Sequence, residues 1–169
     1  MTADISEDYF DAAPAADGVV VRMSANVAAT LAHRVERLAR FLETGEVDAA
    51  PGGLLRRRTT AEDVIRRMYP DVYPDRAAAD GFRQRHSAAL GDSRAARALV
   101  FRCSAQTQHV LSREEAEGWI GALGLVRFLT AERTGRGGDA ADLVWFSWAQ
   151  EALVGALHPD WLSPPTDPR

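Results

Sequence analysis

Two polar side chains on strongly apolar segments are the residues of this sequence best suited to chemistry. Arg127 lies in a segment predicted to be helical from 113 to about 133, and Glu151 lies in the apolar stretch 142–158. A buried carboxylate needs a partner, because an unpaired buried charge is very costly. We therefore predict that Arg127 pairs with Glu151 in the interior, with Gln150 hydrogen-bonded nearby. We favour a pair that orders helix packing; the alternative is a tuned carboxylate that binds a ligand or acts in catalysis.

Tryptophans surround this predicted polar core and form the candidate aromatic pocket. Trp145 and Trp148 make a second apolar line beside the main stripe of the helix 142–158, so we expect this helix to be covered on most sides and central to the fold. Trp119 lies on the preceding predicted helix. A small-molecule site in the Trp145, Trp148 and Glu151 neighbourhood is the alternative to a purely structural role.

Other chemistries find little support in the residue spacing. The four histidines have no metal-ligand spacing, and a single cysteine, Cys103, excludes a cysteine cluster and an intramolecular disulfide. The sequence has no nucleophile elbow, phosphate loop or dinucleotide fingerprint. We therefore predict no catalytic residue, no metal and no cofactor. Cys103 lies four residues after Leu99 on an apolar helix face, so we expect it to be buried rather than reactive.

The charge is unevenly distributed along the chain. All 20 basic residues are arginines, and the net charge is −4. Acids dominate residues 1–50 and 103–169, whereas arginines dominate 51–102. The candidate anion or partner surface consists of Arg34, Arg37, Arg56, Arg57 and Arg58. Because runs of charge usually solvate helix surfaces, nucleic-acid binding is the minor alternative here.

The segments that must position these residues are mostly helical. We expect a strand at 19–23, a helix capped by Ser24 and ended by Gly45, short helices at 59–68 and 76–90, and a further helix at 94–106. A second strand at 108–111 should pair with 19–23. Ser112 and Glu115 form a capping box for the long helix. Gly118, Gly121 and Gly124 recur along this helix, which favours close approach of another helix; the alternative is a ligand groove.

These elements predict a mainly α protein, a compact bundle of five or six helices with a small two-stranded β element. Residues 1–17 are expected to be a disordered acidic tail, 18–158 a single helical domain and 159–169 a flexible tail. No apolar run approaches the roughly 20 residues needed to cross a bilayer, and the acidic N-terminus is unlike a signal peptide, so we expect a cytoplasmic protein with no membrane contact.

The order of these motifs is similar to a known family. The strand VVVRM, the corner MYPDVYPD, the segment SREEAEGWIGAL and the ending WFSWAQEALVGAL together resemble an uncharacterised actinobacterial domain family whose members are described as AosR-like oxidative-stress or transcription regulators. The resemblance covers roughly residues 18 to 158. It implies a mostly helical cytoplasmic domain and a regulatory role. The chain departs from the family where Gly124, Leu125 and Val126 replace an Asn-Asp pair ahead of Arg127, and in having only one cysteine.

From these observations we expect a non-enzymatic regulatory or protein-interaction module, acting in transcription or stress-response control. The expected partner is a protein, with a homodimer as one form, and nucleic acid is weakly supported. The alternative is a small-molecule-binding or accessory protein of a biosynthetic pathway.

Overall fold

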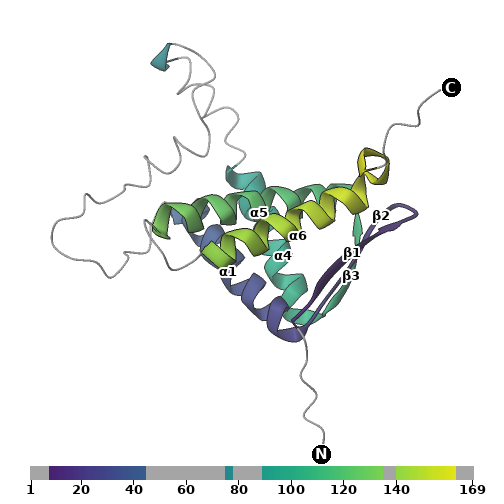
Figure 1. Cartoon of the computed structure of the whole chain (residues 1–169). Coiled ribbons are helices and arrows are strands. Elements are labelled where there is room, and N and C mark those ends of the chain that lie inside the picture. Colours follow the sequence, from purple (N-terminus) through teal and green to yellow (C-terminus); the bar gives the residue numbers. More distant parts are fainter. Residues whose placement is uncertain (1–7, 45–74, 78–88, 135–139, 163–169) are drawn as a thin grey trace, which may run out of the picture.

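The computed structural model describes residues 8–44, 75–77, 89–134 and 140–162 (Figure 1). Within these residues the chain forms α-helices, strands and one short 3-10 helix. In chain order they are β1 Phe10–Ala15, β2 Gly18–Met23, α1 Ala25–Thr44, α4 Ala89–Ala105, β3 Gln108–Ser112, α5 Arg113–Thr134, α6 Ala140–Leu157 and η1 Pro159–Leu162.

The strands form one antiparallel sheet in the order β1-β2-β3, with β2 in the middle. β1 and β2 are joined by a tight turn, whereas β3 comes from a distant part of the chain and places His109 opposite Val21. The predicted pairing of 19–23 with 108–111 is therefore confirmed. The alternation of strand side chains sends Val19, Val21 and Met23 of β2 into the core.

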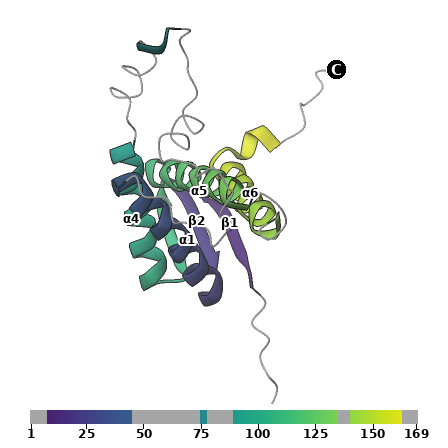
Figure 2. The same cartoon turned by 90° about the vertical axis from the view of Figure 1, so that its left-hand side faces the viewer.

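The helices form the rest of the core. α6 packs mainly along α5 and also on β1, while α5 also packs on α4 and α1 and contacts β3 and β2. α1 and α4 lie together on the side away from β1 (Figure 2). The largest fully buried side chains come from the four helices, β2 and β3, and include Phe146, Met23, Leu31, Leu38, Leu99, Leu111, Leu123 and Leu153.

Two helix starts follow the predicted capping. The Ser24 hydroxyl accepts from the Val27 N–H at 3.3 Å. At α5, the Glu115 N–H donates to the Ser112 Oγ at 3.2 Å, and the Ser112 N–H donates to the Glu115 carboxylate at 2.9 Å, which is the reciprocal capping box. The Ser112 N–H, assisted by Arg102, holds the pKa of Glu115 below its usual range. The first cap fixes the junction between β2 and α1, and the second fixes the junction between β3 and α5.

Gly18 is required where β2 meets β3. A Cβ built on it would lie 1.9 Å from the Leu111 carbonyl oxygen, so any side chain would push the strands apart. The glycine that opens the predicted strand thus has a steric role in the sheet.

The predicted fold class is wrong. The described residues form four α-helices and a three-stranded antiparallel sheet, so the fold mixes helices with a sheet and is not a bundle of five or six helices with a two-stranded element. The predicted helix at 59–68 lies outside the described residues, and so does 76–90 apart from 76–77 and 89–90. Residues 89–90 begin α4, which runs without a break into the predicted helix 94–106. The additional strand is β1. Its sequence FDAAPA contains no β-branched residue, and the strand forms by pairing with β2.

The predicted disordered tail over 1–17 also needs correction. Residues 10–15 form β1, and Phe10 is buried against α6, so the folded domain begins before residue 18. Acidic residues next to alanines resemble a disordered tail, but Phe10 supplies the apolar contact that fixes this segment. At the other end, η1 continues the described structure to residue 162. No helix among the described residues is long and apolar enough to span a membrane.

Candidate functional site

A polar cluster lies between α5 and α6 and contains Arg127 and Gln150, two of the three residues of the predicted polar core. The Arg127 guanidinium donates from Nη1 to the Gln150 Oε1 at 2.7 Å, and the Gln150 Nε2 donates to the Ile120 carbonyl at 3.1 Å. Gln150 therefore uses both ends of its amide inside the helix pair. The contact joins the helices, because each hydrogen bond crosses from one to the other.

The predicted partner of Arg127 is wrong. Glu151 is exposed on α6 and does not form the buried pair with Arg127 that its apolar neighbours suggested. One residue along a helix turns the side chain by roughly 100°, so Gln150 faces α5 while Glu151 faces away. The polar contact in the interior is consequently between a charged and a neutral side chain, and no carboxylate is buried there.

Gly124 makes room for this contact. A Cβ at Gly124 would lie 3.2 Å from the Gln150 Nε2, which is tighter than ordinary packing. Gly118 faces the Ala95 side chain of α4 at 3.4 Å, whereas a Cβ at Gly121 would meet nothing within 4 Å. Two of the three glycines thus allow close approach to other helices, and the third does not.

The tryptophans do not form a single pocket. Trp119 is buried near β3, where its ring lies 5.4 Å from that of His109. Trp145 and Trp148 both make edge contacts with the Phe10 ring, at 5.9 and 6.0 Å. Trp148 remains 47% exposed, so this pair forms part of the surface rather than a closed site.

We define the α6 outer face as Tyr9, Val144, Trp148 and Glu151. Val144 is 70% exposed and lies one turn before Trp148, while Tyr9 directly precedes the Phe10 that Trp148 contacts. Glu151 adds an exposed carboxylate one turn further along α6. The result is an apolar surface with a single acidic residue on the helix beside it, of the composition that protein interfaces favour.

His109 is a buried polar residue that was not among the predicted site residues. Its Nε2 has no hydrogen-bond partner among the described residues. Burial lowers the pKa of His109, the nearby Arg102 guanidinium lowers it further, and a hydrogen bond to the Gln106 backbone acts in the opposite direction. The neutral imidazole is therefore the form that this site favours. The alternation of the predicted strand 108–111 could have placed His109 beside Leu111 on the core face.

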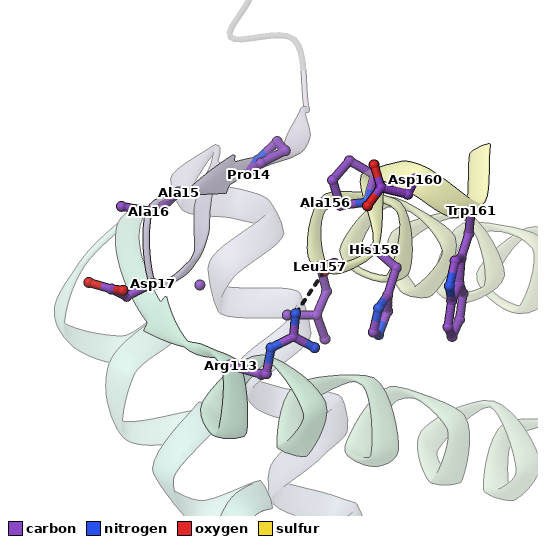
Figure 3. A pocket seen from close by; sticks show the side chains of 12 residues that line it. Pro14, Ala15, Ala16, Asp17, Arg113, Ala156, Leu157, His158, Asp160 and Trp161 are labelled. Carbon is purple, nitrogen blue, oxygen red and sulfur yellow. Dashed lines mark hydrogen bonds between the residues drawn. The ribbon is translucent and has the colours of Figure 1, made fainter. Parts of the chain in front are cut away.

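A groove of about 520 Å³ lies at the C-terminal end of α6 (Figure 3). It is bounded by the β1-β2 turn, the start of α5 and η1. Arg113 reaches across it and donates from Nη2 to the Leu157 carbonyl at 3.4 Å. His158 and Trp161 stack with ring centroids 4.0 Å apart, and Asp17 and Asp160 add carboxylates to the lining. None of the predicted site residues lines this groove.

The predicted arginine surface is only partly described. Arg34 forms an ion pair with Asp142, which ties α1 to the start of α6, and Arg37 also interacts with a neighbouring group. Arg56, Arg57 and Arg58 lie outside the described residues. The two described arginines are thus engaged within the chain.

Cys103 is buried, as predicted. Burial raises the pKa of its thiol to about 12, so the reactive thiolate is disfavoured at neutral pH. Among the described residues, no group of three or more histidine, cysteine or acidic side chains could hold a metal ion.

The fold and these surfaces define a small helical domain built on an antiparallel sheet, with a polar contact inside its last helix pair and an apolar outer face. The chain belongs to the DUF2017 family, a domain of unknown function, whose family model matches residues 8–157. No curated protein and no solved structure in the comparisons matches the chain.

Proposed function

We propose that this protein is a non-enzymatic interaction module that binds a protein partner through the α6 outer face. The observation that carries the proposal is the exposure of Val144 and Trp148 on a helix that is apolar almost throughout. A helix that is apolar all round is normally covered on all sides. The described elements cover only the side of α6 that faces α5 and the sheet.

The partner should present an apolar patch to Trp148 and a basic group near Glu151. Tryptophan and tyrosine are enriched at protein interfaces because they bury a large area at a low cost in conformational entropy. A regulatory role in transcription or stress response, which the family resemblance implies, would then work through a protein and not through direct contact with DNA. A thiol switch within the chain is not part of this proposal, since Cys103 is the one cysteine of the sequence.

A photoreactive amino acid at position 144, introduced in the native host, would capture the partner for identification. The purified partner should then bind the wild-type protein, and Trp148→Ser should weaken its affinity by about tenfold or more. Trp161→Ser is the matched control, because Trp161 is an exposed tryptophan outside the α6 outer face. Equal affinities of the wild type and the Trp148→Ser variant would contradict the proposal.

The second candidate function is a small-molecule-binding accessory protein. The groove at Arg113 favours it, because it combines a guanidinium with the exposed ring of Trp161. This location differs from the Trp145, Trp148 and Glu151 neighbourhood expected from the sequence. A thermal-shift screen of metabolites with the wild type, Arg113→Ala and Trp161→Ser tests it. Stabilisation that only the wild type shows would support a ligand in the groove, and stabilisation shared by all three would exclude it there.

A further inference from the structure

The two edges of the sheet are not equivalent, and β1 is the protected one. The Ser24 N–H donates to the Tyr9 carbonyl at 3.0 Å, which sets the alternation of hydrogen bonds between β1 and β2. The backbone groups of Phe10, Ala12 and Pro14 therefore point away from β2. Phe10 is only 4% exposed, and proline has no N–H to donate. Among the outward residues of β1, Ala12 is therefore the main one whose backbone groups could pair with another strand.

The edge formed by β3 has backbone groups that are free to pair with another strand. The Met23 N–H donates to the Thr107 carbonyl at 2.9 Å, which sets the alternation on the other side of β2. The backbone groups of Gln108, Val110 and Ser112 therefore point away from the sheet. The Ser112 N–H is used in the capping box, but the N–H groups of Gln108 and Val110 point outward from the edge.

The side chains of β3 leave this edge open. Gln108, Val110 and Ser112 are all exposed, and Val110 is 64% exposed. The strand QHVLS contains no proline and no lysine, arginine or acid, the residues with which natural proteins usually guard an edge. An edge of this kind is a template for pairing with a further strand.

An apolar row on the outer face of the sheet ends at the same place. The register aligns Ala13 of β1 with Val20 of β2, and Val20 with Val110 of β3. Side chains directly opposite on neighbouring strands stabilise a sheet through their contacts. The row stops at Val110, where one neighbour is missing.

We propose that β3 pairs antiparallel with β3 of a second copy of the chain, with Val110 on the two-fold axis. In this register Val110 exchanges two hydrogen bonds with Val110 of the second copy, and the Gln108 N–H meets the Ser112 carbonyl of the second copy. The strand suits this symmetry because its outward residues read polar, apolar, polar from either end. The sheet becomes six-stranded, and the apolar row continues across the axis.

The helix ends that flank β3 favour a second copy over an unrelated strand. α4 ends at Ala105, just before β3, and α5 starts at Arg113, just after it. Antiparallel pairing brings the C-terminal end of α4 beside the N-terminal end of α5 of the other copy, which is the favourable arrangement of helix dipoles. Arg102 in the last turn of α4 already pairs with Glu115 of α5 in the same chain, so the complementarity between the two ends of the strand rests on the helix dipoles.

A charge exchange at position 110 tests both the partner and the register. The wild-type full chain should sediment as a dimer, and Val110→Lys or Val110→Glu should each weaken dimerisation by about tenfold or more, because like charges would lie directly opposite. Mixing the two variants should restore the dimer. Ala13→Lys is the matched control, since it adds the same charge at the far end of the apolar row, and it should remain dimeric.

A wild-type chain that stays monomeric over a wide concentration range would overturn the proposal. So would a dimer that survives Val110→Lys, or variants that do not recover on mixing. Circular dichroism will verify that each variant is folded. As an independent measurement, Val110→Cys should form a disulfide-linked dimer on oxidation, because Cys103 is buried and the new thiols face each other across the axis. Failure of that cross-link in a folded dimer would place the interface elsewhere.

Discussion

The two sides of α6 have similar apolar composition and very different surroundings. On the inner side, Phe146 and Leu153 are fully buried, and Gln150 is bonded to both Arg127 and the α5 backbone. On the outer side, Val144 is mostly exposed, and Trp148 is about half exposed and touches only the edge of the Phe10 ring among the described aromatic residues. The helix therefore has one side that holds the domain together and another whose apolar residues serve no comparable purpose within it.

The polar residues of α6 show the same division. Asp142 pairs with Arg34, the Ser147 hydroxyl donates to the Leu143 carbonyl, and Gln150 bonds to α5. Glu151 alone of the four polar side chains in α6 projects from the outer side, next to Trp148. This difference teaches that an apolar helix can carry an exposed surface and a core surface that its residue types do not distinguish.

The largest expected effect is at the centre of the inner side. Phe146→Ala should lower the free energy of unfolding by about 3–5 kcal/mol, because it removes a fully buried ring and leaves a cavity. Urea denaturation followed by circular dichroism measures it. A loss below about 1 kcal/mol would show that this side is not the packed core we describe.

A smaller effect is expected at the polar contact. Gln150→Leu should cost about 1–3 kcal/mol, since it removes the acceptor of Arg127 and the donor to the Ile120 carbonyl. The double variant Gln150→Leu/Arg127→Met should lose less free energy of unfolding than the sum of the losses in the two single variants. A double-mutant cycle by urea denaturation decides the matter, and strict additivity would mean that the residues are not coupled.

The buried His109 on the core side of β3 should make the stability of the domain depend on pH. The folded-state pKa of His109 lies below its ordinary value of 6.5, so the unfolded chain binds the proton more readily. The stability that this provides is complete above pH 6.5 and is lost as the pH falls through the folded-state pKa. Between pH 7.5 and 5, the wild type should therefore lose more stability than His109→Phe. Identical pH slopes in urea denaturation would show that the imidazole is not buried in its neutral form.

The smallest effect on stability is expected on the outer side of α6. Val144→Ser should change the free energy of unfolding by no more than about 0.5 kcal/mol, because the side chain is already mostly in water. Its binding to the partner should nevertheless fall. The free energy of unfolding and the affinity for the partner should be measured on the same preparation. A large loss of stability would show that Val144 is part of the packed core.

Local signals in the sequence were sufficient for several parts of this fold. The capping box at Ser112 and the pairing of 19–23 with 108–111 could be predicted, because they depend on neighbouring residues or on β-branched runs. The strand β1 could not, since its alanines and Pro14 carry no strand signal and its stability comes from β2 and α6. The side on which Glu151 projects was missed for a related reason: α6 is so apolar that its periodicity does not reveal which face meets α5.

The pairing of β2 with β3 has a consequence during synthesis. His109 follows its partner Val21 by about 90 residues, so at 5–20 residues per second the ribosome delivers β3 some 5 to 20 s after β2, as an order of magnitude. Throughout that interval the β1-β2 hairpin must wait with Val19, Val21 and Met23 exposed, since an isolated hairpin has little stability of its own. The core face of the hairpin is covered by α5 and α6, which follow β3 in the chain, so the nascent chain needs protection until the second half of the sequence has emerged.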